Sequence, residues 1–143
     1  MSPQDFVNKV LAMAREAETR FGVPAAVAVG QAVLETGYGS HVRGNNLFNI
    51  KWTGSGKHTE LYVQEWIGGK PRWVRARFRA YDSWQESLED WCRLMQAPRY
   101  DQCLAHTGDP INYIDCIWRS GYATDPRYPQ KVVQIMRRHG LID

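Results

Sequence analysis

The sequence predicts one α+β domain that is mostly helical and carries a single β-hairpin inserted between its helices. Two periodicities lead to this fold class. Apolar residues recur at helical spacing toward both ends of the chain, whereas residues 59–67 and 72–80 alternate in the manner of half-buried strands. A length of 143 residues supports one hydrophobic core but not two independent ones. We therefore expect residues 1–143 to form a single domain.

The first helix is expected to begin after Ser2 and to run to about Arg20. Ser2 can cap the helix, and Pro3 suits its first turn. The apolar positions that recur at helical spacing are Phe6, Val7, Val10, Leu11 and Ala14. The opposite face is charged, so this helix should cover the core with one side only.

The second helix should be buried, because the run from Pro24 to Leu34 is apolar on every face except at Gln31. Pro24 suits the first helical position, and Gly37 suits the position just past the end. Glu35 then lies in the last turn, where burial and the partial negative charge of the helix end both raise the pKa of a carboxyl group. A carboxylic acid that keeps its proton near neutral pH can act as a general acid. The alternative is that Glu35 emerges where the helix stops and is solvated.

A loop and the hairpin follow this helix. Residues 37–46 are rich in Gly, Ser and Asn, and residues 47–50 should pack a turn onto the core before the strands begin. We expect the hairpin turn at residues 68–71, Gly-Gly-Lys-Pro. In the second strand one face should carry Val74, Ala76, Phe78 and Ala80, and the other Trp73, Arg75, Arg77 and Arg79.

Three further helix starts are expected after the hairpin. Ser83 with Glu86 forms a capping-box pattern before a helix with periodic apolar residues. Residues 109–110 and 125–126 are both Asp-Pro, which combines an N-cap residue with a first-turn proline. Gly140 should end the last helix.

Composition excludes several classes of function. The three cysteines, Cys92, Cys103 and Cys116, lack the close spacing of metal-binding motifs, and we expect reduced thiols rather than a disulfide framework. A net charge of +3 is too small to predict a nucleic-acid partner. Residues 1–5 do not resemble the start of a signal peptide, and no stretch reaches membrane-spanning length. We therefore expect no membrane partner and a route to any extracellular site that depends on something outside this sequence.

Five segments carry a family resemblance. In order they are residues 31–39 (QAVLETGYG), 45–51 (NNLFNIK), 78–83 (FRAYDS), 97–100 (APRY) and 121–126 (GYATDP). Together they resemble the family 73 glycoside hydrolases, which are peptidoglycan endo-β-N-acetylglucosaminidases. The resemblance implies a lysozyme-like α+β fold and hydrolysis of the β-1,4 bond between N-acetylglucosamine and N-acetylmuramic acid. Asn49 stands where the family commonly has glycine, a mild departure because asparagine tolerates a left-handed backbone.

In this resemblance the catalytic acid of the family falls on Glu35, the residue to which the burial pattern also points. Glycosidic cleavage normally needs a second carboxylate, and the match places it on Glu65. An acid is unusual on that strand face, which also carries Leu61, Val63 and Ile67. Glu60 lies on the opposite face of an unbulged strand. The alternative for Glu65 is an ion pair with Lys70 or Arg72 near the end of the hairpin.

Other site residues are expected from the same resemblance and from residue type. Tyr122 resembles a family tyrosine that contacts the N-acetyl group of the substrate, although it could be a half-buried core phenol. Asp125 needs no role beyond capping. The candidate substrate-binding residues are Tyr38, Asn46, Trp52, Trp66 and Trp84. We expect no metal and no cofactor, because no ligand cluster or phosphate-binding loop is present and hydrolysis needs only water.

Three functions remain open from the sequence. The first is a peptidoglycan N-acetylglucosaminidase, and the second is a muramidase or lytic transglycosylase that uses the same cleft. The third is a non-catalytic wall-binding or phage structural module. In each case we expect a monomer that binds peptidoglycan glycan strands at the bacterial wall, in the periplasm or outside. A phage lysin, a secreted effector and an excised domain of a longer protein all fit.

Overall fold

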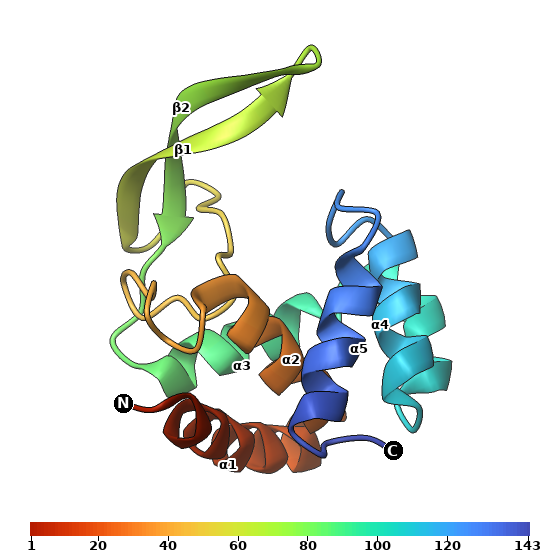
Figure 1. Ribbon diagram of the computed structural model, residues 1–143. Helices are drawn as coiled ribbons and strands as arrows, with labels where there is room; N and C mark the ends of the chain where they lie inside the picture. The colour runs from red at the N-terminus through yellow and green to blue at the C-terminus, as the bar shows by residue number, and fades with distance from the viewer.

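The computed structural model describes residues 1–143, apart from the side chain of Trp66, and consists of a helical body from which a long hairpin projects (Figure 1). The elements in chain order are α1 (Pro3–Phe21), α2 (Ala25–Thr36), β1 (His58–Ile67), β2 (Lys70–Arg79), α3 (Trp84–Leu94), the 3₁₀ helix η1 (Pro98–His106), α4 (Pro110–Arg119) and α5 (Tyr128–Arg138). The two strands form one antiparallel sheet, and Lys51 adds an isolated β-bridge to Phe78 of β2. This is the helix-rich architecture with one hairpin that the sequence predicts.

Helix α2 is buried among the other helices, as its apolar sequence predicts. It ends at Gly37, whose φ of 56° is the left-handed conformation typical of a helix C-terminus. Pro24 is the N-cap residue and not the first helical residue, because its carbonyl accepts the first helical hydrogen bond, from Ala28 N–H. A Cβ atom on Gly30 would lie 2.8 Å from Cγ1 of Val132. Glycine at this position therefore lets α2 pack closely against α5.

The hairpin has a shorter turn than the sequence suggests. Gly68 and Gly69 alone connect the strands, with φ values of 60° and 78°. Positive φ at both central residues gives a turn whose twist matches that of the strands. Lys70 and Pro71, expected in the turn, belong to β2. The pairing runs without a bulge along both strands, so side chains alternate strictly between the two faces of the hairpin.

Two of the expected helix starts are confirmed, and the third is displaced. Ser83 and Asp109 cap α3 and α4 by accepting a backbone N–H from the first turn of each helix. In contrast, α5 does not begin at Asp125, because its N-cap residue is Arg127. The Asp125 carboxylate accepts a hydrogen bond from Arg127 N–H at 2.9 Å and one from Lys131 Nζ at 2.7 Å. Asp125 therefore holds the turn that precedes α5.

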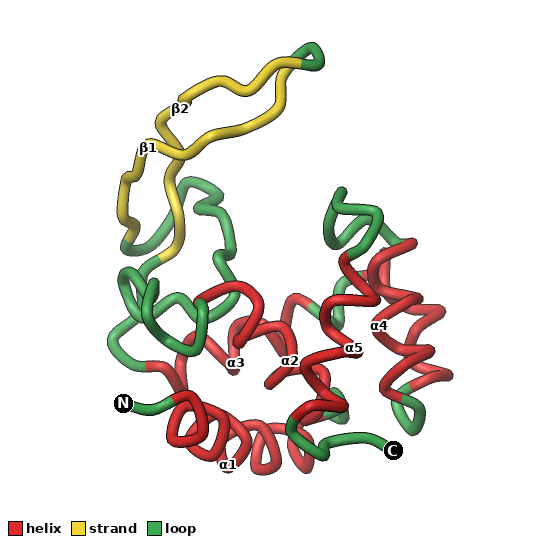
Figure 2. Tube along the Cα trace, in the orientation of Figure 1, coloured by secondary structure: helices red, strands yellow, loops and turns green.

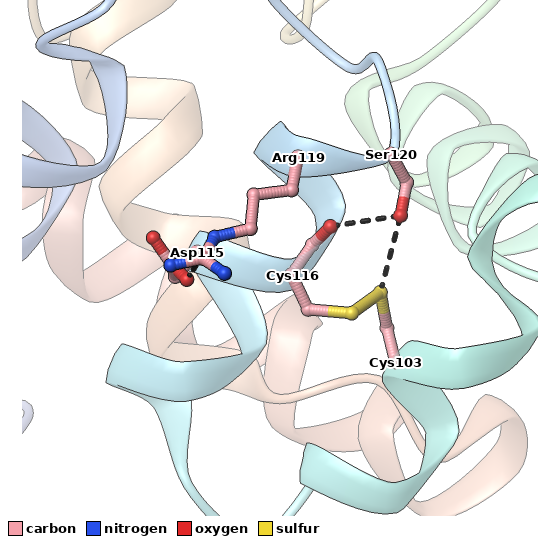
Figure 3. Close-up of a disulfide and its surroundings, with 5 residues drawn as sticks. All are labelled: Cys103, Asp115, Cys116, Arg119 and Ser120. Carbon is pink, nitrogen blue, oxygen red and sulfur yellow. Dashed lines mark hydrogen bonds and ion pairs between the residues drawn. A yellow bond between two sulfur atoms is a disulfide. The ribbon is translucent and has the colours of Figure 1, made fainter.

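The expectation of three reduced cysteines is wrong. Cys103 in η1 and Cys116 in α4 form a disulfide (Figure 3). The pairing could not be expected because no sequence pattern predicts η1, the element that brings Cys103 against α4. The Ser120 hydroxyl donates to the Cys116 carbonyl at 2.8 Å and lies 3.8 Å from Sγ of Cys103. The third cysteine, Cys92, is buried, and burial raises the pKa of its thiol to about 12.

Removing the disulfide should destabilise the protein measurably. The two cysteines are 13 residues apart, and closing a loop of this size is worth about 3 kcal/mol in the unfolded-chain entropy model. In a domain of this size the melting temperature should therefore fall by roughly 6–12 °C. The check is thermal unfolding of the wild type and of a Cys103→Ala/Cys116→Ala variant, each with and without reductant. Reductant should lower the transition of the wild type and leave the variant unchanged; an unresponsive wild type would show that the bond does not form in solution.

Candidate active site

Glu35 lies in the last turn of α2, between the base of the hairpin and the segment that connects α4 to α5. Figure 2 shows these two parts rising on opposite sides of α2. Glu35 borders two hollows, of about 320 Å³ on the hairpin side and about 470 Å³ on the side of the connecting segment. We call the two together the Glu35 cleft. Its position follows from the buried helix, which carries the carboxyl group from the core to the floor of the cleft.

The two hollows have different linings. The hairpin side is formed partly by apolar residues of the hairpin, Leu61, Val63 and Phe78. The other side is formed by the connecting segment and by α5, and it contains Tyr122, Asp125, Tyr128 and Lys131. A saccharide needs both apolar and hydrogen-bonding surfaces, and both hollows supply side chains of each kind beside the partly buried acid.

Both oxygens of the Glu35 carboxyl group have a hydrogen-bond donor. Asn49 Nδ2 donates to Oε2 at 3.0 Å, and the Tyr128 hydroxyl donates to Oε1 at 3.3 Å. Burial raises the pKa of Glu35. The two hydrogen bonds favour the charged form and so lower the pKa, but they offset only part of the rise. The expected direction of the pKa shift is therefore confirmed, with burial as its largest cause.

Asn49 has a role that its family position did not suggest. Its φ of 52° is left-handed, in agreement with the glycine common at that position. Its Nδ2 also donates to the backbone carbonyl of Glu35 at 3.0 Å, in addition to the carboxylate. The side chain that glycine lacks therefore ties the loop to the end of α2 and fixes the carboxyl group.

Glu65 lies on the face of the hairpin that also carries Leu61 and Val63, both part of the cleft lining. Its carboxylate accepts a hydrogen bond from Lys51 Nζ at 3.2 Å, so the ion pairs suggested with Lys70 or Arg72 are replaced by one with Lys51. Lys51 itself lines the cleft together with Glu35. The pair Lys51–Glu65 therefore links the hairpin to the edge of the cleft.

Glu60 lies on the opposite face of the hairpin, as the alternation predicts. Its carboxylate pairs with Arg77 Nε at 2.8 Å and Arg75 Nε at 3.9 Å, and lies 3.7 Å from His58 Nε2. These contacts hold it among the side chains of the outer face. Glu60 does not line the Glu35 cleft.

Tyr122 is half-buried and lines the cleft beside Glu35. Its ring lies between Tyr100 and Tyr128, with centroids 6.4 and 5.8 Å away. Burial, and secondarily the charge of Glu35, raise the pKa of its phenol. The group is therefore a neutral hydroxyl at the floor of the cleft and can donate a hydrogen bond to a bound ligand.

The candidate substrate-binding residues are scattered. Tyr38 contacts the end of α5, where its hydroxyl lies 2.8 Å from His139 Nε2, and Trp84 packs edge-on against Phe6. Asn46 lines the hairpin side of the cleft, but it is 1% exposed and its amide is used to hold its own loop and β2.

Two tryptophan candidates remain. Trp52 borders a third hollow that it shares with Glu65, and its ring packs against His58. The side chain of Trp66 lies outside the described part of the structure. The structure therefore brings together Glu35 and Tyr122, with Glu65 at the edge of the same region, and leaves Tyr38 and Trp84 away from them.

A larger hollow, of about 560 Å³, lies elsewhere, between the base of the hairpin and α3. Among its charged lining residues, Arg79 pairs with Asp90, while Lys57 and Glu89 pair with Asp82 and Arg20, which are not part of the lining. No group of three or more His, Cys, Asp or Glu side chains in the described chain could hold a metal ion. Among the described helices, none is both long and apolar enough to cross a membrane.

Besides Asn49, three residues around Glu35 were not predicted as part of the site. Tyr128 and Lys51 line the cleft, and Gln31 donates to the Tyr128 hydroxyl at 2.9 Å. Gln31 did give a signal, since it is the one polar residue in the apolar helix and precedes Glu35 by one helical turn. No local sequence pattern indicated that Lys51 and Tyr128 lie near Glu35, because this proximity depends on how distant segments pack.

Sequence comparison finds a matching family model and similar proteins. Residues 11–141 match a family model described as mannosyl-glycoprotein endo-beta-N-acetylglucosaminidase. The chain is 39% identical over 148 residues to the peptidoglycan hydrolase FlgJ of Vibrio parahaemolyticus, in an alignment covering 96% of this chain and 47% of that protein. It is 29% identical to the exo-glucosaminidase LytG of Bacillus subtilis, covering 96% of this chain and 52% of LytG. The chain thus spans about half the length of these relatives.

Solved structures of similar proteins have the same fold. A peptidoglycan hydrolase mutant from Sphingomonas sp. A1 superposes with a TM-score of 0.83 at 34% identity, covering 96% of this chain and 98% of that one. The glycoside hydrolase domain of Salmonella typhimurium FlgJ, truncated at its C-terminus, gives a TM-score of 0.78 at 30% identity, covering 99% and 100%. These matches confirm the lysozyme-like α+β fold that the sequence predicts.

Proposed function

Because this chain belongs to the endo-β-N-acetylglucosaminidase family, we propose that it hydrolyses the β-1,4 bond between N-acetylglucosamine and N-acetylmuramic acid in peptidoglycan. The observation that carries the proposal is the partly buried carboxyl group of Glu35, with a raised pKa, in a two-sided cleft. Similar proteins that are named as peptidoglycan hydrolases support the choice of substrate. The site of action is then the bacterial wall.

In this mechanism Glu35 is the general acid. Its raised pKa keeps it protonated at a pH where an exposed glutamate is charged, so it can protonate the leaving-group oxygen as the glycosidic bond breaks. In this proposal Tyr122, which lines the cleft beside Glu35, donates a hydrogen bond to the N-acetyl group of the sugar next to that bond. Both roles need only side chains of the cleft and water.

Glu65 is the proposed second carboxylate, which activates water or stabilises the positive charge of the transition state. In the free protein it is held by Lys51. The hairpin is anchored to the helical body only at its base, so it can move over a bound glycan and bring Glu65 toward the scissile bond (Figure 1). The Lys51 ammonium group would then be released to face the substrate.

Digestion of purified peptidoglycan tests the proposed bond specificity. After borohydride reduction and mass spectrometry of the products, the new reducing ends should be N-acetylglucosamine. Reducing N-acetylmuramic acid would identify a muramidase, and its 1,6-anhydro form a lytic transglycosylase. Binding of peptidoglycan without any product would identify a non-catalytic module.

A further inference from the structure

A buried glutamine and a buried tyrosine lie behind Glu35. Gln31 is on α2, four positions before Glu35, and is 0% exposed. Tyr128 is at the start of α5 and is 4% exposed. Gln31 Nε2 donates to the Tyr128 hydroxyl oxygen at 2.9 Å, and the Tyr128 hydroxyl donates to Oε1 of Glu35 at 3.3 Å. These two hydrogen bonds form a relay that runs from the core to the cleft.

The amide of Gln31 sets the direction of this relay. An amide NH₂ group can only donate, so the phenol oxygen of Tyr128 must accept from it. The phenol has a single hydrogen, which is then left for Glu35. If the amide were absent, the phenol oxygen would be free to accept the proton of the neutral Glu35, and the acid proton would point into the protein instead of into the cleft.

A purely structural role does not explain the glutamine. Its Oε1 atom is buried and has no hydrogen-bond partner within the described chain. A buried polar atom without a partner is destabilising, and methionine or leucine would fill the same volume without that cost. Gln31 is also the only polar residue in the run from Pro24 to Leu34. An amide at this position of an otherwise apolar run therefore points to a role in the chemistry of the neighbouring acid.

We propose that Gln31 and Tyr128 are positioning residues that hold the Glu35 carboxyl group in one orientation and keep its acid proton directed into the cleft. Tyr128 fixes Oε1 from behind while Asn49 fixes Oε2 from the side. The inference rests on the proposed function, since it assigns a role in proton donation by Glu35.

Other titratable groups face the same carboxyl group and must be considered in any pH measurement. The charged or ionisable groups lining the cleft are His41, Arg43, Lys51, Asp125 and Lys131. The phenols are Tyr62, Tyr122 and Tyr128. Lys51 pairs with Glu65 and Lys131 with Asp125, so both ammonium groups have a carboxylate partner outside the relay.

The test compares Gln31→Met and Tyr128→Phe with the wild type. Each change removes stabilisation of the charged form of Glu35, so its pKa should rise by about one unit. Since a general acid must be protonated, activity falls as the pH rises through that pKa, and this falling limb should move to higher pH in both variants. At the pH optimum kcat should drop about tenfold while KM stays near the wild-type value.

If Gln31 and Tyr128 had only a structural role, replacing them would leave the falling limb of the pH–activity profile at the same pH. Val29→Ala is the control, because Val29 is 0% exposed on the same helix and lies outside the relay. It should lower stability and leave the limb in place. The pKa of Glu35, measured by NMR of its side-chain carboxyl carbon in the free variants, gives a readout that needs no activity. An unchanged pKa in both relay variants would overturn the inference, whereas activity retained after Glu35→Gln would overturn the proposed function instead.

Discussion

Glu35→Gln should abolish nearly all hydrolysis of peptidoglycan. The amide has the shape of the carboxyl group but no acid proton, and general acid catalysis typically contributes about 10²–10⁴-fold to the rate. The loss should appear in kcat rather than in glycan binding, because Tyr122 and the hairpin side of the cleft are unchanged. The measurement is release of soluble muropeptides alongside a pull-down with insoluble peptidoglycan. More than about half of wild-type activity in the variant would refute the assignment of Glu35.

The same substitution should leave the fold at least as stable. The pKa of Glu35 is raised by burial, so the folded protein holds this proton more tightly than the unfolded chain does. Stability therefore falls as the pH rises from the ordinary glutamate pKa through the raised one, where the buried group must ionise. Glutamine does not ionise, so the melting temperature of the variant should match the wild type at low pH and equal or exceed it near neutrality. A variant that melts lower at every pH would show that the carboxyl group has a structural role.

The fold was predictable where one local pattern decides the structure. The apolar run before Glu35 indicates a buried helix, and the alternation on either side of Gly68 and Gly69 indicates a hairpin, whatever the rest of the chain does. The disulfide was not predictable, because Cys103 meets Cys116 only through η1, whose sequence has no clear periodicity. The late start of α5 was missed because Asp125 accepts hydrogen bonds in a turn much as it would at a helix N-terminus.

The site was predictable in part for the same reason. Burial along one helix leads to Glu35, and strand alternation places Glu60 and Glu65 on opposite faces. The contacts that tune Glu35 come instead from Asn49 and Tyr128, which are separated from it by 14 and 93 positions. Only the packing of α5 against α2 brings the second of these to the carboxyl group. No local pattern contains that information.

Glu65→Gln should depress turnover strongly, whereas Glu60→Gln should leave it near the wild-type value. The hairpin has no bulge, so the two acids lie on opposite faces, and the face of Glu65 supplies most of the hairpin residues that line the cleft. Glu65 also pairs with Lys51, which lines the cleft beside Glu35. Removal of a second carboxylate that activates water or stabilises the transition state should cost on the order of 10²-fold in kcat.

Glu60 is the matched control for this change. It is a glutamate of the same strand, with a similarly exposed side chain at 37% against 38% for Glu65, and it also takes part in ion pairs. Its pairs with Arg75 and Arg77 lie at the surface, where loss of an ion pair has little effect on stability. Steady-state kinetics on soluble glycan fragments should separate the two variants. If Glu60→Gln were the damaging change, the hairpin would have to present its other face to the substrate. If neither substitution changed turnover, Tyr122 and the N-acetyl group of the substrate itself would become the candidates that stabilise the transition state.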